Sequence, residues 1–268
     1  MAARRATIWR ITCPLTQRQI EYGFDYYFKD DWDDIDDVTT VEEFRGQARL
    51  SINCTQLAER GYASATDRKR IVAEWCKFLE GHPRQFTQLA FGTRLSQEVV
   101  DAVGCQVNLK RLDIKWGAYQ DLSPIANLRK LELLWIGTGA GVKSIAPLTD
   151  LPRLVGLSIE NFQKVSDYSP LSQLRKLQSL TIEGDGLGPQ YIRIESLKFL
   201  EKMTQLRHLK LLTYRLRSKD YQPILKLRKL ESLSLPSSRE VKSCYDQLVA
   251  LPKLQWGFLK TQPKLYKK

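Results

Sequence analysis

The sequence predicts an α/β solenoid, in which short parallel strands stack side by side and a returning segment joins each strand to the next. Two observations predict this fold class: a leucine-rich phrase recurs along the chain, and the segments between its copies share a proline. The phrase is NLRKLELLWI at 127–136, QLRKLQSLTI at 173–182 and KLRKLESLSL at 226–235. Repetition at a fixed period is the sequence signature of repeat architectures.

The period of the repeat supports the solenoid. Its pattern is L-x-x-L-x-x-L-x-[LI], and the third apolar position falls at residues 112, 134, 157, 180, 209, 233 and 257. The steps of 22, 23, 23, 29, 24 and 24 residues fit neither a heptad nor a propeller blade. The copies at both ends are partial, and Gly257 replaces the third apolar residue in the last of them.

Each copy predicts one strand and one turn. The closing L-x-[LI] alternates apolar and polar residues, which is typical of a short strand with one buried face. The segments DLSPIANL, SIAPLTDL and DYSPLSQL carry proline at a common offset. Because proline cannot donate to a sheet, we expect 3₁₀-like turns there. The longer step between Leu180 and Leu209 predicts a loop followed by a true helix.

The first hundred residues are less regular and predict a cap of mixed helices and strands. Strand-like alternation occurs at residues 8–11, 49–52 and 88–91, and Leu89 lies 23 residues before Leu112, so a divergent repeat is predicted to begin there. A helix is predicted from a cap at Thr66 or Asp67 to Gly81, and a shorter one over 96–104. Without such a cap, the first strand would expose an unpaired edge.

The repeats resemble leucine-rich repeats of the 22-residue bacterial class typified by the internalins, whose convex segment reads DISPLxxL. The resemblance covers about residues 105–260. It implies a leucine-rich-repeat horseshoe with parallel strands on its concave face. The predicted regions are a cap of divergent N-terminal repeats over 1–104 with an acidic loop at 30–37, leucine-rich repeats over 105–260, and a basic C-terminal tail over 261–268. The asparagine ladder of the family is missing.

Charge is unevenly distributed along the chain. Residues 1–100 hold 14 Lys and Arg against 15 Asp and Glu, whereas residues 101–268 hold 28 against 15. This asymmetry suggests a partner with an acidic surface, although a solvated surface is the commoner reason for such an excess of charge. No apolar run approaches the length of about 20 residues that crosses a bilayer, and Arg10 interrupts any secretory signal. We therefore expect a cytoplasmic protein that does not bind membranes.

Residues 21–44 contain six aspartates between Asp30 and Asp37, around Trp32 and Ile35. Three interpretations remain open: a flexible acidic surface loop, a segment that neutralises the basic repeats or docks a partner, and a metal site. The segment lacks the glycine turn and closing glutamate of an EF-hand. Aromatic residues between the acids favour docking over solvation alone.

The sequence contains no motif of catalysis or cofactor binding. A Walker loop, G-x-G-x-x-G, H-E-x-x-H and G-x-S-x-G are all absent. The glycine-rich stretch at 137–141 follows a repeat strand and does not lead into a helix, so it is interpreted as a repeat turn. We expect no cofactor, no metal and no enzymatic activity.

Two surfaces are candidates for binding. Residues that flank the strand leucines are expected on the concave face; they include Arg111, Asp113, Lys115, Trp116, Leu133, Trp135, Glu160, Glu183, His208, Lys210, Trp256 and Phe258. The recurring Arg-Lys pair is expected to form a basic edge just before the strands; its residues are Arg129, Lys130, Arg153, Arg175, Lys176, Arg228 and Lys229.

From these surfaces the sequence predicts a non-enzymatic protein–protein interaction module that binds a protein through its concave face. A bacterial-type repeat protein without a catalytic domain acts by occupying a surface, so an inhibitor, an immunity protein and an adaptor are all compatible roles. The alternative from another class is nucleic-acid binding along the basic edge.

Overall fold

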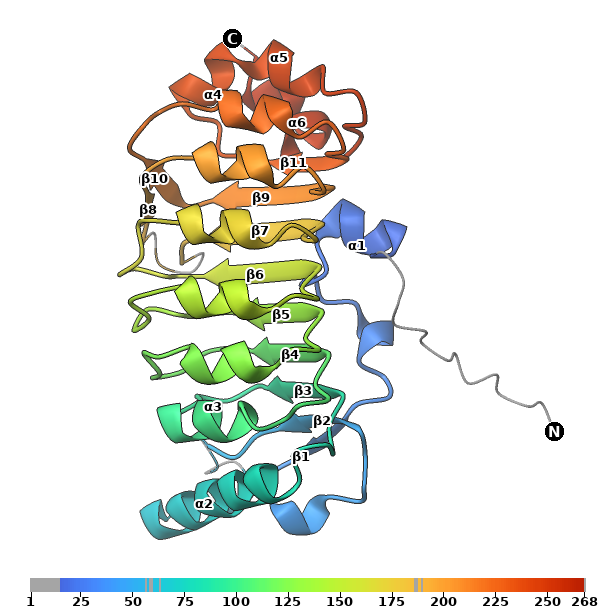
Figure 1. Cartoon of the computed structure of the whole chain (residues 1–268), viewed down its shortest axis with the longest axis vertical. Helices are drawn as coiled ribbons and strands as arrows, with labels where there is room; N and C mark the ends of the chain where they lie inside the picture. Colours follow the sequence, from blue (N-terminus) through green and yellow to red (C-terminus); the bar gives the residue numbers. More distant parts are fainter. Residues whose placement is uncertain are drawn as a thin grey trace, which may run out of the picture.

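Nine strands form a single parallel sheet in the part of the chain that the structure describes. This structure, a computed structural model, describes residues 15–55, 57, 60–62, 64–185, 188 and 190–267. The strands follow one another in chain order (Figure 1) and are β1 (Asp36–Val38), β2 (Arg49–Ile52), β3 (Gln88–Phe91), β4 (Arg111–Ile114), β5 (Leu133–Ile136), β6 (Gly156–Glu160), β7 (Ser179–Glu183), β9 (His208–Leu212) and β11 (Ser232–Ser234). The predicted solenoid is confirmed, and its sheet is open.

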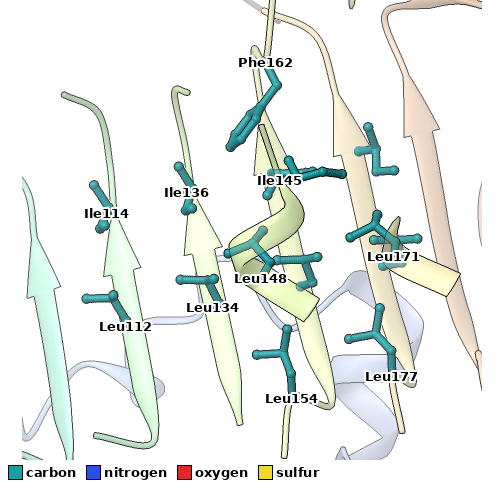
Figure 2. Packing of buried hydrophobic residues seen from close by; sticks show 14 of the residues in the cluster. Leu112, Ile114, Leu134, Ile136, Ile145, Leu148, Leu154, Phe162, Leu171 and Leu177 are labelled. Atoms are coloured by element: carbon teal, nitrogen blue, oxygen red, sulfur yellow. The ribbon is translucent and has the colours of Figure 1, made fainter. Parts of the chain in front are cut away.

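One leucine from each repeat pairs in register with the leucine of the next. The ladder runs through Leu50, Leu89, Leu112, Leu134, Leu157, Leu180, Leu209 and Leu233, and each of these side chains is fully buried. Figure 2 shows Leu112 beside Leu134, and Ile114 beside Ile136, on neighbouring strands. The divergent repeat predicted at Leu89 is therefore confirmed, and the sheet continues before it through β2 and β1.

The convex returns are 3₁₀ turns, as the prolines predict. Four of them begin with a proline in the first two positions: η4 (Ser123–Asn127), η5 (Ala146–Asp150), η6 (Ser169–Gln173) and η8 (Gln222–Lys226). Their apolar residues, such as Leu148 and Leu171, pack onto the strand leucines from the outer side (Figure 2). Each repeat thus closes its own section of the core.

The helix predicted between Leu180 and Leu209 is wrong. The inserted residues form a short strand, β8 (Ile192–Ile194), which pairs with β10 (Tyr214–Leu216) in a second parallel sheet. The return itself is the 3₁₀ turn η7 (Lys198–Lys202), with Phe199 and Leu200 buried. Since Leu197 and Leu200 occupy the positions that apolar residues hold in the other returns, the local pattern favours the same turn even without a proline.

The N-terminal cap contains the two predicted helices. The longer helix, α2 (Ala65–Gly81), begins two or three residues earlier than predicted, because Ser64 caps it by accepting a hydrogen bond from the Asp67 amide. The second is α3 (Gln97–Val103). The acidic segment at 30–37 comprises the end of the 3₁₀ turn η1 (Lys29–Asp31), a turn over 32–35 and the start of β1. A further turn, η2 (Val41–Glu43), lies before β2. The strand predicted at 8–11 lies outside the described residues.

The C-terminal end is closed by short helices. They are α4 (Arg239–Ser243), α5 (Tyr245–Val249), α6 (Phe258–Thr261) and η9 (Pro263–Leu265). The predicted basic tail packs against this end, because Tyr266 is buried and its hydroxyl donates to the Leu235 carbonyl at 2.6 Å. Gly257 adopts a φ of 86° close to the Leu233 backbone, where no side chain fits, and it ends the repeat series.

Candidate functional site on the concave face

Residues 15–35, here called the strap, cross the concave face of the sheet from β11 back to β1 (Figure 1). Three hydrogen bonds mark this path. Ser232 Oγ on β11 donates to the Glu21 carbonyl at 3.0 Å, and Ser158 Oγ on β6 donates to the Asp25 carboxylate at 2.7 Å. Near β1, Arg49 on β2 donates to the Asp31 carbonyl at 3.3 Å. The strap therefore occupies the face on which the sequence predicts a partner.

The strap begins with a short helix, α1 (Gln17–Tyr22), whose local sequence explains its formation. Thr16 and Gln19 form a capping box, in which each side chain accepts a hydrogen bond from the other's backbone amide. Gly23 ends the helix with a φ of 93°, a conformation that favours glycine. The capping box is visible in the sequence as the motif Thr-x-x-Gln at residues 16–19, which lies outside the leucine repeats.

The strap is anchored by three buried apolar side chains: Leu15, Ile20 and Phe24. They pack as one cluster against Leu133, Trp135, Val155 and Trp256. Burial of a large apolar side chain contributes about 1.5–3 kcal/mol, so these three side chains provide most of the attraction between the strap and the sheet.

Small residues on the strands make room for the strap. On β6, β7 and β11, six concave-facing positions beneath it hold small, buried residues: Gly156, Ser158, Ser179, Thr181, Ser232 and Ser234. At Gly156 a Cβ would lie 2.7 Å from Cδ1 of Phe24. The positions equivalent to Gly156 on β4, β5 and β9 carry the larger residues Arg111, Leu133 and His208. The concave face is thus shaped for residues 15–25 of the same chain.

His208 also holds the strap. Its Nδ1 lies 2.9 Å from the Ile20 carbonyl, which can only accept, so we assign the proton to Nδ1. Burial lowers the pKa of His208, although the nearby Asp25 carboxylate opposes the shift. Its Nε2 is buried and faces Gly23, where a Cβ would lie 3.3 Å from it. A neutral, positioned imidazole in contact with the strap has a structural role.

Two ion pairs flank the strap on the strands. Arg111 donates to both oxygens of Asp113, at 2.7 and 3.2 Å. Burial raises the pKa of Asp113, and the positive charge of Arg111 partly offsets this. Lys210 Nζ lies 2.7 Å from Glu183 Oε2 across β7 and β9. Charges of both signs on this face are therefore already paired within the chain.

Glu160 on this face has a raised pKa. Trp135 donates its indole N–H to Glu160 at 2.8 Å. Burial raises the pKa of Glu160 to about 7, and the negative charges of Asp25 and Glu183 add to the shift, whereas the Trp135 hydrogen bond and Lys210 oppose it. At neutral pH this carboxyl is therefore partly protonated.

We expect Glu160→Gln to stabilise the protein more at high pH than at low pH. The pKa of Glu160 is raised from 4.5 to about 7 in the folded state, so between these pH values the folded protein binds more protons than the unfolded chain. The stability of the parent protein therefore falls as the pH rises from 4.5 through about 7. Allowing for partial exposure, the variant should gain about 1–2 kcal/mol over the parent between about pH 5 and about pH 8.

Urea unfolding of both proteins at the two pH values measures this difference. His208, whose pKa is lowered by burial, is present in both proteins, so its effect cancels in the comparison. The control is Glu201→Gln, which removes the same charge from an exposed position. A constant difference for Glu160→Gln would contradict the altered titration.

The predicted concave-face residues fall into three groups. Asp113 and His208 are buried, and Leu133, Trp135 and Trp256 pack against the strap. The half-buried polar residues are Arg111, Glu160, Glu183 and Lys210. The remaining residues lie outside this path: Lys115 is exposed and Trp116 half-buried after β4, and Phe258 lies on α6. The sequence therefore fails to predict how much of this face is covered, because the strap lies far away in the chain.

The outer side of the strap carries a cluster of exposed aromatic side chains. Tyr22, Tyr26 and Tyr27 are 47, 53 and 68% exposed. The rings of Tyr22, Tyr26 and Phe28 contact one another with centroid distances of 4.8–5.5 Å. We call Tyr22, Tyr26, Tyr27 and Phe28 the aromatic cluster. The alternation of aromatic and acidic residues in 21–44 is the sequence signal for this surface, but the signal does not identify the individual residues.

Every side chain of the predicted basic edge is exposed. The edge is not continuous, because Thr204 and Gln205 replace the Arg-Lys pair in the repeat of β9. Some of its charges contact the preceding repeat: Lys130 Nζ donates to Asn108, and Lys229 Nζ to Gln205, both at 2.7 Å. The edge is thus a solvated surface that is interrupted before its last repeat, in the repeat of β9.

Metal-binding groups do not cluster in the described ranges. Within them, no group of three or more His, Cys, Asp or Glu side chains could hold a metal ion. Burial raises the pKa of Cys54 to about 12, so its thiolate is not populated near neutral pH. No helix in this part of the chain is long and apolar enough to span a membrane.

Comparisons with known proteins show a shared fold. No protein-family model and no curated protein sequence matches the chain. An internalin (inlF) from Listeria monocytogenes aligns with a TM-score of 0.50 and 19% identity over 78% of this chain and 51% of its own, so this chain spans about half its length. An internalin C2 (inlC2) from the same organism has a TM-score of 0.43 and 22% identity, over 68% of this chain and 65% of its own. The plant peptide hormone receptor RGFR1 aligns with a TM-score of 0.41 and 17% identity, over 78% of this chain and 30% of its own.

Proposed function

We propose that the chain is a non-enzymatic protein-binding module whose partner docks on the concave side, on the outer surface of the strap. The observation that carries this proposal is the aromatic cluster. Of the large apolar side chains that are exposed in the described residues, Tyr22, Tyr26 and Tyr27 lie within six positions of one another, while Val107, Tyr191 and Leu265 are scattered. Grouped exposed aromatics bounded by polar residues are typical of protein interfaces.

The covered concave face supports docking on the strap itself. The side chains that the sequence suggests for partner contact, Trp135 and His208 among them, already bind the strap. A partner that approaches from this side first meets Tyr26, Tyr27 and the exposed acids. Binding therefore requires no rearrangement of the core of the solenoid. A module of this kind acts by occupying or bringing together surfaces, as an inhibitor, an immunity protein or an adaptor does.

We expect the double variant Tyr26→Ala/Tyr27→Ala to lose its partner. Loss of two aromatic contacts at the centre of an interface costs about 2–4 kcal/mol, or roughly 30- to 1000-fold in affinity. The measurement is affinity capture from the source organism, followed by titration of the purified captured protein by calorimetry. Tyr191→Ala is the matched control, because Tyr191 is 48% exposed but lies beside β8.

Capture that is retained by the double variant and by the control alike would rule out the strap surface. Folding of each variant is checked by circular dichroism. Since both tyrosines are exposed, little stability should be lost.

Nucleic-acid binding along the basic edge is the second candidate function. The observation that favours it is the exposure of all its side chains, from Arg129 to Lys229. The same capture separates the two candidates when it is repeated after nuclease treatment. A nucleic-acid partner would disappear, and its binding would weaken steeply with salt.

A further inference from the structure

The strap already binds an arginine of its own chain. The guanidinium carbon of Arg18 lies 3.2 Å from the centre of the Phe28 ring, and its Nη1 lies 3.2 Å from Asp30 Oδ2. An aromatic face and a carboxylate thus hold one guanidinium between them. Both interactions are recognised ways of binding arginine, and both are weak at an exposed site.

A second guanidinium shows that the strap uses this chemistry more than once. Arg111 on β4 lies with its guanidinium carbon 5.2 Å from the centre of the Trp32 ring. The negative charge of Asp31 on the same turn acts on Arg111 as well. Two rings of the strap therefore each face an arginine beside an acidic residue.

The charge of the strap is opposite to that of the rest of the molecule. Residues 15–35 hold six Asp and Glu against two Lys and Arg, whereas the remainder of the chain holds 24 against 40. Asp30, Asp33 and Asp34 are exposed. A basic segment of a partner is repelled by most of this molecule and attracted to the strap, so its docking is directed to this one surface.

We propose that the aromatic cluster and Asp30 form a receptor for arginine side chains in a basic segment of the partner protein. An incoming guanidinium takes the place of Arg18 between Phe28 and Asp30, and the exposed rings of Tyr22 and Tyr26 contact the neighbouring residues of that segment. Arginine is preferred over lysine, because its planar guanidinium stacks on a ring while it donates to a carboxylate. This inference rests on the proposed function and specifies its partner class.

The experiment uses the full chain and a fluorescently labelled peptide of alternating glycine and arginine, with an alternating glycine and lysine peptide of equal charge for comparison. Fluorescence anisotropy at low ionic strength gives the dissociation constants. The arginine peptide should bind about two- to fivefold more tightly than the lysine peptide. Asp30→Asn and Phe28→Leu should each weaken the binding of the arginine peptide about two- to fivefold.

Arg18→Gln provides the decisive test, because it should strengthen binding of the arginine peptide by about two- to fivefold. The control is Arg239→Gln, an exposed arginine on α4 whose loss changes the net charge equally. Equal affinities for the two peptides, or equal effects of the two arginine variants, would overturn the proposal. If the tyrosine double variant loses its captured partner while the arginine peptide does not bind, the arginine site is refuted and the proposed function stands. If the peptide binds as expected but no partner is captured, the proposed function is refuted instead.

Discussion

A Gly156→Val variant is expected to displace the strap from the concave face. A Cβ at this position would lie 2.7 Å from Cδ1 of Phe24 and 2.8 Å from Cδ2 of Leu133, closer than carbon atoms approach in folded proteins. Valine adds two further methyl groups in the same direction. Overpacking of this kind costs about 1–3 kcal/mol, and Phe24 also loses contacts when it moves, so we expect docking of the strap to weaken by about 2–3 kcal/mol.

Hydrogen–deuterium exchange of peptides that cover residues 15–28 measures this effect. The Gly23 amide donates to the Gln19 carbonyl within the docked strap, and its exchange should accelerate by about a hundredfold, while the amides of β6 remain protected. Phe24→Ala serves as the second mutation of a double-mutant cycle. Without the Phe24 ring the steric clash with a side chain at position 156 is reduced, so the effects of the two substitutions should not be additive. Additive effects of the two substitutions would show that they do not meet.

A Leu157→Ala variant is expected to destabilise the whole protein by about 3–5 kcal/mol. Leu157 is fully buried and pairs in register with Leu134 on one side and Leu180 on the other, so the substitution leaves a cavity between two repeats. A solenoid derives its stability from contacts between adjacent repeats, and a central repeat loses such contacts on both sides.

Urea unfolding monitored by circular dichroism gives the free energy of unfolding of the parent and the variant. The control is Val107→Ala, because Val107 is 43% exposed and its truncation should change the stability by no more than about 0.5 kcal/mol. A loss below about 1 kcal/mol at Leu157 would mean that the leucine ladder is not the main source of stability.

The leucine repeats could be predicted from the sequence because each one contacts the equivalent residues of the adjacent repeats. Leucines on neighbouring strands from Leu112 to Leu233 lie 22–24 residues apart, except for the step of 29 residues from Leu180 to Leu209, so the pattern shows both the strands and their register. Proline at a common offset likewise predicts the 3₁₀ turns. The turn η7, which has no proline, is the one that the sequence predicts as a helix.

The strap could not be predicted in the same way, because its contacts occur only once. Ile20 meets His208 across 188 positions, and Glu21 meets Ser232 across 211. No period connects such residues. Two local signals are nevertheless present, namely the capping box of Thr16 and Gln19 and the small concave-facing residues of β6, β7 and β11. Small residues at these positions on several strands indicate that another segment packs on them.

The hydrogen bond between Glu21 and Ser232 also determines the order in which the molecule is completed. During synthesis the strap is made before any of the strands on which it lies. The repeats can fold one after another as they emerge, since each needs only its neighbour. The strap must wait until β11 has been made, more than two hundred residues later. It is thus synthesised before the strands on which it lies and docks after they have formed, so its docking marks a finished sheet.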